Sequence, residues 1–233
     1  MRLDKFLSNY SGLSRKEARQ AIKGGDVLVN GDMVTDPTCN IDADARVRWS
    51  GMEIAPAGPR YFMLNKPAGY LCANSDPHHP TVLDLMLDED NPETLQVAGR
   101  LDLDTTGLVL ITDDGQWNHR VTAPKAHKAK IYRVALEQPV TESAVNLFAE
   151  GILLRSEKKR TRPALLEILA PRQVRLTIHE GKYHQVKRMF AAIGNHVLHL
   201  HREQIAGIIL DTALEPGAYR PLTPAEIASI EHD

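Results

Sequence analysis

Residues 99–112, GRLDLDTTGLVLIT, constrain the fold of this chain more than any other stretch. Two carboxylates, Asp102 and Asp104, precede a Thr-Thr-Gly turn. Residues 108–111 then form a short apolar run that ends at Asp-Asp-Gly, which predicts a buried strand. The two acids should therefore lie on a loop braced by a core strand, where a reacting group can be held. Asp is also common in turns, so a purely structural role for both acids is equally open from this pattern.

The remaining sequence predicts two domains of unequal size. Residues 1–58 predict a small module of two helices and a hairpin sheet. Its signals are the capping-box spacing of Ser14 and Glu17 and the Asn30-Gly31 turn. A Pro-rich linker, APAGP at residues 55–59, follows. Residues 59–233 contain many short predicted strands and few helices, which indicates an α+β domain with a mostly antiparallel mixed sheet.

Composition and cysteine usage narrow the class of protein. The chain has 233 residues, and no apolar run approaches the roughly 20 residues that a membrane helix needs. The N-terminus lacks the apolar segment of a secretory signal. Cys39 and Cys72 have neither disulfide-framework nor metal-ligand spacing, so we expect a reducing cytoplasm.

The net charge of −2 hides a strong segregation of charge along the chain. Residues 81–119 carry one Arg and nine acidic side chains, whereas residues 120–190 carry fifteen Lys or Arg and six acidic side chains. Residues 1–30 have six basic and three acidic side chains. Because a polyanion responds to the local field rather than to the total, these basic segments fit an enzyme that binds RNA.

The acidic and histidine residues are compatible with other kinds of chemistry to different degrees. Asp102 and Asp104, two positions apart, could hold Mg²⁺ with substrate phosphates. They fit a glycosidase pair poorly, because sequence neighbours seldom straddle a sugar. His196, His199 and His201 lack a known zinc-ligand spacing, so surface or RNA-proximal positions are favoured. The chain contains no Gly-rich phosphate-binding loop, and nucleotide cofactors gain no support.

The first fifty residues resemble the S4 RNA-binding module. The similarity rests on RLDKFL followed by SRKEARQAIKGGDVLVNG, in the expected order. It implies that the basic helix after Ser14 faces an RNA backbone, and that four of its side chains contact phosphates: Arg15, Lys16, Arg19 and Lys23. Phosphate contacts give affinity and register rather than sequence specificity.

The rest of the chain resembles the pseudouridine synthases. GRLDLDTTGLVLITDDG is similar to their central motif, and KIYRV and EGKYHQVKRMF match two further motifs in order. Three further segments resemble the RsuA-type synthases, which modify small-subunit (16S) ribosomal RNA: YFMLNKPAGY, DDGQWNHR and HQVKRMFAAIGNHV. The sequence departs from the family pattern at Lys182, where Arg is usual, and in the run AHKAKIY. The resemblance therefore assigns no substrate contacts to Lys182 or to residues 125–130.

The resemblance assigns roles to individual residues. Asp102 is implied as the catalytic carboxylate, Tyr132 should lie against the uracil ring, and Lys187 should pair with Asp102. Arg188 is expected nearby as a substrate contact, and Arg100 would fill the vacated base stack or hold a phosphate. Asp104 is left with shaping the turn that aims Asp102.

We therefore expect a monomeric, cofactor-free and metal-free enzyme that converts one uridine of 16S ribosomal RNA to pseudouridine. Its substrate would be the RNA itself or an assembling ribonucleoprotein particle. The alternative is a non-catalytic ribosome assembly factor that binds RNA and retains the fold.

The segment from Gly181 onward, KYHQVKRMFAAIG, predicts a helix. Val186, Met189 and Phe190 have the spacing of a core-facing side. The opposite side of this helix is expected to carry Tyr183 with Lys187 and His184 with Arg188, each pair four residues apart.

Overall fold

The computed structural model describes residues 1–42, 44–54 and 58–230, and it forms two compact units, Met1–Gly58 and Pro59–Asp233. The predicted linker at residues 55–59 falls partly on positions 55–57, which lie outside the described residues. Each unit has a hydrophobic core of its own.

The first unit packs two helices on a small sheet. Helix α1 (Leu3–Tyr10) and helix α2 (Arg15–Gly24) precede four short strands, β1 (Val27–Val29), β2 (Asp32–Met33), β3 (Val47–Trp49) and β4 (Met52–Ile54). The strands form an antiparallel sheet in the order β2-β1-β3-β4. The prediction lacked β4, because three residues beside a Ser-Gly turn give too little alternation to mark a strand.

Helix α2 begins at the predicted capping box. The Glu17 backbone N donates to Ser14 Oγ at 3.3 Å, and the Ser14 backbone N donates to Glu17 Oε2 at 2.8 Å. The helix ends at Gly25, whose φ of 81° is the left-handed conformation that closes a helix at low cost to glycine. Ile22 on its inner face packs with Leu3 and Phe6 of α1 in one core.

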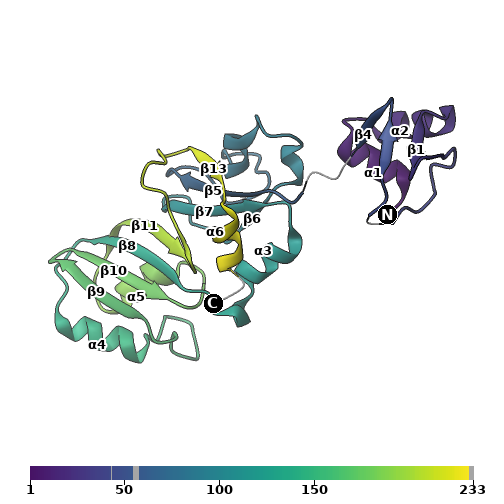
Figure 1. The fold of residues 1–233 in the computed structure, drawn as a ribbon. Helices are drawn as coiled ribbons and strands as arrows, with labels where there is room; N and C mark the ends of the chain where they lie inside the picture. The colour runs from purple at the N-terminus through teal and green to yellow at the C-terminus, as the bar shows by residue number, and fades with distance from the viewer. Residues whose placement is uncertain (43, 55–57, 231–233) are drawn as a thin grey trace. The chain divides into compact units, whose positions relative to one another are not determined.

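The second unit is built on a sheet of nine strands among its described residues. In chain order they are β5 (Tyr61–Lys66), β6 (Gln96–Ala98), β7 (Thr106–Thr112), β8 (Lys130–Leu136), β9 (Leu165–Ala170), β10 (Gln173–Ile178), β11 (Val197–Ile205), β12 (Ile208–Ile209) and β13 (Tyr219–Pro221). The main order is β13-β5-β7-β11-β8-β10-β9, with β6 paired to β7 and β12 paired to β11 (Figure 1). The pairing of β7 with β11 is parallel and the others are antiparallel, which confirms the predicted mostly antiparallel mixed sheet.

Helices cover both faces of this sheet. They are α3 (Gly115–Thr122), α4 (Glu142–Glu150), α5 (Gln185–Ala192) and α6 (Pro224–Ser229), with 3-10 turns η1 (Val82–Met86), η2 (Pro92–Thr94) and η3 (Pro124–Ala126). Every helix that the structure describes is too short or too polar to cross a membrane.

Strand β7 lies at the centre of the unit and joins its two cores. Leu108 and Leu110 pack in the core that contains Trp117 of α3, whereas Val109 and Ile111 pack in the core on the opposite face. All four side chains are fully buried, so the strand predicted at residues 108–111 is confirmed. The loop that carries Asp102 is therefore attached to a strand that is buried on both faces.

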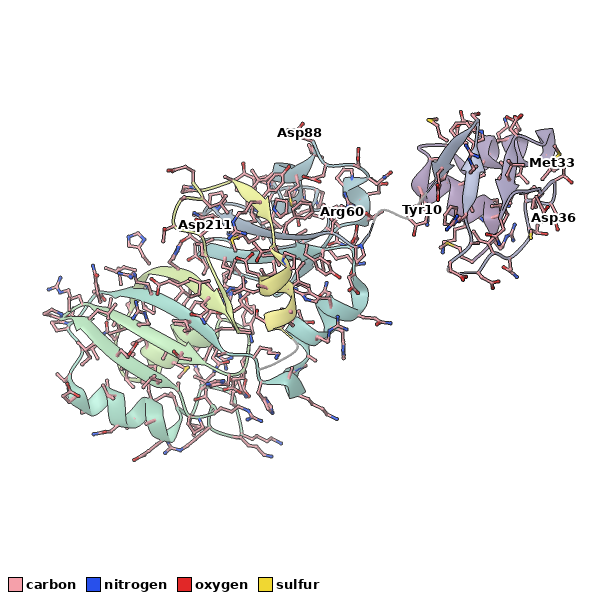
Figure 2. The ribbon with its side chains drawn as sticks, in the orientation of Figure 1. Tyr10, Met33, Asp36, Arg60, Asp88 and Asp211 are labelled. Atoms are coloured by element: carbon pink, nitrogen blue, oxygen red, sulfur yellow. The ribbon has the colours of Figure 1, made fainter. Side chains whose placement is uncertain are left out.

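Arg60, labelled in Figure 2, lies near the start of the second unit. Its backbone N and its Nε donate to the two carboxylate oxygens of Asp113, at 2.7 and 2.8 Å. This pair ties the start of β5 to the end of β7. At the opposite end of the chain, β13 adds an edge strand beside β5 that the sequence did not predict, because Pro221 lies within it.

Candidate active site

A cavity of about 1220 Å³ opens in the second unit beside the Asp102 loop. Its walls come from residues 97–103 with Thr105, from residues 178–186, from residues 71–73 and from the segment between α3 and β8. Asp102, Tyr132 and Arg100 all line it. Residues that are far apart in the sequence therefore meet at one hollow.

Two buried cations, Lys66 and Arg202, donate hydrogen bonds to the backbone of the Asp102 loop. Lys66 Nζ donates to the carbonyls of Pro67, Leu103 and Thr105 at 3.0, 3.1 and 2.8 Å. These three acceptors match the three donors of an ammonium group. Burial lowers the pKa of Lys66, although the charges of the Asp102 and Asp104 carboxylates oppose that shift.

Arg202 of β11 holds the two ends of the same loop. Its guanidinium donates to the carbonyls of Gly99, Arg100 and Leu108 at 3.0, 3.3 and 2.8 Å. The side chain is 1% exposed. Buried charges are stable when they are hydrogen-bonded, and these three bonds go to backbone carbonyls before the Asp102 loop and in β7 after it. Lys66 and Arg202 therefore fix the path of the chain around Asp102.

The Asp102 carboxylate lies between two basic side chains. Lys187 Nζ is 3.4 Å from Oδ2 of Asp102, and His184 Nε2 is 3.5 Å from Oδ1. The Asp102 side chain is 27% exposed, so it is partly shielded from water yet open to the cavity. The predicted proximity of Lys187 and Asp102 is thus present in the structure.

Asp104 does more than shape the turn. Lys187 Nζ donates to Asp104 Oδ1 at 2.6 Å, which is shorter than its distance to Asp102. This hydrogen bond lowers the pKa of Asp104. Partial burial alone would lower the pKa of Lys187, but the Asp104 hydrogen bond and the two carboxylate charges outweigh it and raise that pKa. The Asp104 side chain is 71% exposed, so it pairs with Lys187 from the solvent side.

The floor and rim of the cavity carry aromatic rings. Tyr132 on β8 is 7% exposed, and Lys130, two residues earlier on the same strand face, also lines the cavity. Burial lowers the pKa of Lys130 to about 8. At the rim, the Tyr183 ring stacks on His184 with centroids 3.8 Å apart, and Tyr183 is 74% exposed. An exposed flat ring at a cavity mouth is suited to contact with a nucleobase.

The helix predicted to include Tyr183 and His184 begins later, at Gln185. His184 has φ 47°, a left-handed conformation that ends the preceding loop and aims its ring at Asp102. Arg188 on α5 turns to the adjacent loop, where it donates to the carbonyls of Tyr183 at 3.0 Å and Arg155 at 2.8 Å. Lys182 pairs with Glu157 at 2.8 Å.

The four basic residues predicted as phosphate contacts all lie on α2 of the first unit and are exposed: Arg15, Lys16, Arg19 and Lys23. Arg15 and Arg19 also pair with Asp4 of α1. No group of three or more His, Cys, Asp or Glu suited to a metal ion is found among the residues that the structure describes.

Comparison with known proteins decides the family. The family described as RNA pseudouridylate synthase matches residues 60–192, and the S4 domain matches residues 1–47. This chain belongs to the RNA pseudouridylate synthase family. The matched region contains the Asp102 loop, Tyr132 and Lys187, and it supplies all of the cavity lining except Leu200, Arg202 and Ile205 of β11.

Full-length relatives support the same assignment. The chain is 55% identical over 231 residues to ribosomal small subunit pseudouridine synthase A of Escherichia coli K12, covering 99% of this chain and 100% of that protein. It is 52% identical over 232 residues to the enzyme of the same name from Vibrio parahaemolyticus, covering 99% of each. A crystal structure of a pseudouridylate synthase matches with a TM-score of 0.72 and 49% identity over 99% of both chains. The chain is therefore an RNA pseudouridine synthase with an N-terminal S4 domain.

Proposed function

We propose that this enzyme converts one uridine of small-subunit ribosomal RNA to pseudouridine, with Asp102 as the reacting carboxylate. The observation that supports this most strongly is the position of Asp102, between Lys187 and His184 on the wall of a cavity large enough for a nucleotide. The names of the Escherichia and Vibrio relatives supply the RNA class.

The proposed reaction takes place within one nucleotide. The bond between N1 of uracil and C1′ of ribose breaks, the base turns, and C5 bonds to C1′. C5 then loses its proton and N1 gains one, so the product is an isomer of the substrate. Asp102 must be ionised to act at the sugar, and the ammonium of Lys187 lies 3.4 Å from its Oδ2.

We assign the other groups around the cavity to holding the base. The target uridine must leave its stack to reach a carboxylate on the wall of a cavity. Tyr132 would lie against the detached ring while it turns. Arg100 would occupy the space that the base leaves or would bind a neighbouring phosphate. Arg188 would support the substrate loop through its contacts with residues 155 and 183.

The S4 domain would bring the enzyme to its RNA. The exposed basic face of α2 offers charge to the phosphate backbone without reading sequence. We infer that the enzyme acts as a monomer, in the cytoplasm, on ribosomal RNA or on an assembling small-subunit particle.

Tritium release tests the proposed chemistry. Small-subunit RNA labelled with tritium at uracil C5 loses the label only when C5 is deprotonated. The wild-type enzyme should release it and Asp102→Asn should not. If the wild type releases no tritium from either naked RNA or assembling particles, the alternative of a non-catalytic assembly factor replaces the proposal.

A second experiment separates docking from chemistry. Neutralising Arg15, Lys16 and Arg19 together should weaken RNA binding and reduce its dependence on salt concentration. The single-turnover rate on saturating RNA should change little. An equal loss in that rate would contradict the docking role of α2.

A further inference from the structure

Asp4 of the first unit lies beneath three arginine side chains. Its carboxylate accepts hydrogen bonds from Arg2 Nε and Nη2 at 3.2 and 2.9 Å, from Arg15 Nη2 at 3.1 Å and from Arg19 Nε at 2.9 Å. The Asp4 side chain is fully buried. The arginines come from the start of α1 and from α2, so one carboxylate gathers residues from two elements.

The arginines, unlike Asp4, face the solvent. Their side chains are 42%, 45% and 52% exposed for Arg2, Arg15 and Arg19. A guanidinium has five N–H donors. Asp4 takes two from Arg2 and one each from Arg15 and Arg19, which leaves donors on every guanidinium for a second anion. With one carboxylate and three guanidiniums, the cluster has a net charge of +2.

A simple gain in stability explains this arrangement poorly. Partly exposed ion pairs contribute little, and a buried carboxylate carries a desolvation cost that an apolar residue would avoid. Four hydrogen bonds to one carboxylate do, however, fix the orientation of three side chains that are otherwise flexible. Fixed planar donors are what recognition of a phosphate requires.

We infer that Arg2, Arg15 and Arg19 form a pre-organised site for an RNA backbone phosphate, and that Asp4 is the residue that positions them. The inference rests on the proposed function, because that function supplies the RNA. It adds Arg2 to the binding surface, and it separates the clustered arginines from Lys16 and Lys23, whose flexible ammonium groups contribute mainly net charge.

A matched pair of variants tests the site. Arg2→Gln and Lys5→Gln each remove one positive charge from α1, and Lys5 is exposed on that helix. In the full-length enzyme, the dissociation constant for a transcript of small-subunit ribosomal RNA is measured at several salt concentrations. We expect Arg2→Gln to weaken binding about tenfold and to reduce the salt slope by about one, and Lys5→Gln to change affinity less than twofold. Equal effects of the two variants would overturn the inference, because only net charge would then matter.

For Asp4→Asn, positioning by Asp4 and net charge predict opposite changes in RNA affinity. The variant gains one positive charge, so an account based on overall electrostatics predicts tighter binding. Positioning by Asp4 predicts binding about tenfold weaker, because the amide cannot accept hydrogen bonds from all three arginines. Tighter or unchanged binding by a folded variant would refute the role of Asp4. Circular dichroism and hydrogen exchange in α2 establish folding, and if Asp4→Asn fails to fold, the Arg2 and Lys5 pair decides the inference.

Failure of the arginine site can be distinguished from failure of the proposed uridine isomerisation, because binding and tritium release are measured separately. Wild type and Lys5→Gln are also assayed for tritium release at saturating RNA, and the inference predicts that their rates agree within twofold. If wild type binds RNA but releases no tritium, the chemistry fails while the binding comparison stands. If wild-type binding shows no dependence on Arg2, the site fails while the chemistry stands.

Discussion

Substitution of Gly107 by alanine should destabilise the second unit severely. Gly107 has φ +101° and pairs with Arg202 where β7 runs parallel to β11. A Cβ at this position would lie 2.3 Å from the Arg202 carbonyl oxygen and 2.8 Å from its backbone N. Both are backbone atoms of a neighbouring strand, so relief of the contact requires the two strands to separate.

The size of the effect follows from these two terms. Holding a non-glycine residue at such a φ costs about 1–3 kcal/mol. Forcing β7 from β11 adds a cost similar to overpacking a core, about 1–3 kcal/mol. We expect a total loss of about 4 kcal/mol, a large share of the 5–15 kcal/mol by which domains are stable. With a urea m-value of about 2 kcal/mol per M, the unfolding midpoint should fall by about 2 M.

The assay uses the fluorescence of Trp117, which is fully buried in the same unit. The chain has two tryptophans, so a Trp49→Phe background leaves Trp117 as the only reporter. Gly115→Ala is the matched control, because a Cβ there meets no heavy atom within 4 Å and the residue opens α3. The control should shift the midpoint by less than 0.5 M. A similarly small shift for Gly107→Ala would refute the account of the β7–β11 contact.

Three further substitutions test the surroundings of Asp102 and the Asp4 cluster. Lys187→Gln removes the ammonium beside Asp102 and should lower the single-turnover rate by about 10²-fold, whereas the control Lys182→Gln should lower it less than tenfold. A loss in Lys187→Gln no larger than that in Lys182→Gln would argue against the role of Lys187. Lys66→Met leaves the carbonyls of Leu103 and Thr105 without their donor, so it should lower the free energy of unfolding by about 2–4 kcal/mol, measured by urea titration. Lys125 is exposed, and the control Lys125→Met should have little effect in the same titration. In the first unit, burial alone would raise the pKa of Asp4, but hydrogen bonds from Arg19, Arg2 and Arg15 bring it to about 2. The folded-state pKa lies below the unfolded value, so Asp4 stabilises the fold above about pH 4, and that contribution disappears as the pH falls toward 2. Hydrogen exchange of α2 measured across this range should show the loss in wild type and a flatter profile in Asp4→Asn.

Local patterns predicted the elements that hold the site. The apolar run at residues 108–111, the Ser14 capping box and the core spacing of Val186, Met189 and Phe190 depend on neighbours in the sequence, and the structure confirms each. The sequence motifs placed Asp102 and Lys187 together by resemblance, and the two side chains lie 3.4 Å apart.

Features that depend on distant partners were not predictable in the same way. Lys66 and Arg202 look like ordinary surface cations, because five of the six carbonyls that accept their hydrogen bonds lie more than thirty residues away. His184 fits a helical pattern, yet it takes a left-handed conformation and contacts Asp102. Asp4 and Arg19, fifteen positions apart on two helices, gave no local sign of their pairing.

The rates of two neighbouring carboxylate variants test the central claim most directly. Asp102 and Asp104 both contact Lys187. Of these two carboxylates, Asp102 is the one that also pairs with His184 and lines the cavity in the described structure. Single-turnover pseudouridine formation on saturating small-subunit RNA should fall by more than about 10⁴-fold in Asp102→Asn and by less than about tenfold in Asp104→Asn. Retained activity in Asp102→Asn together with loss in Asp104→Asn would contradict the assignment of Asp102 as the reacting group.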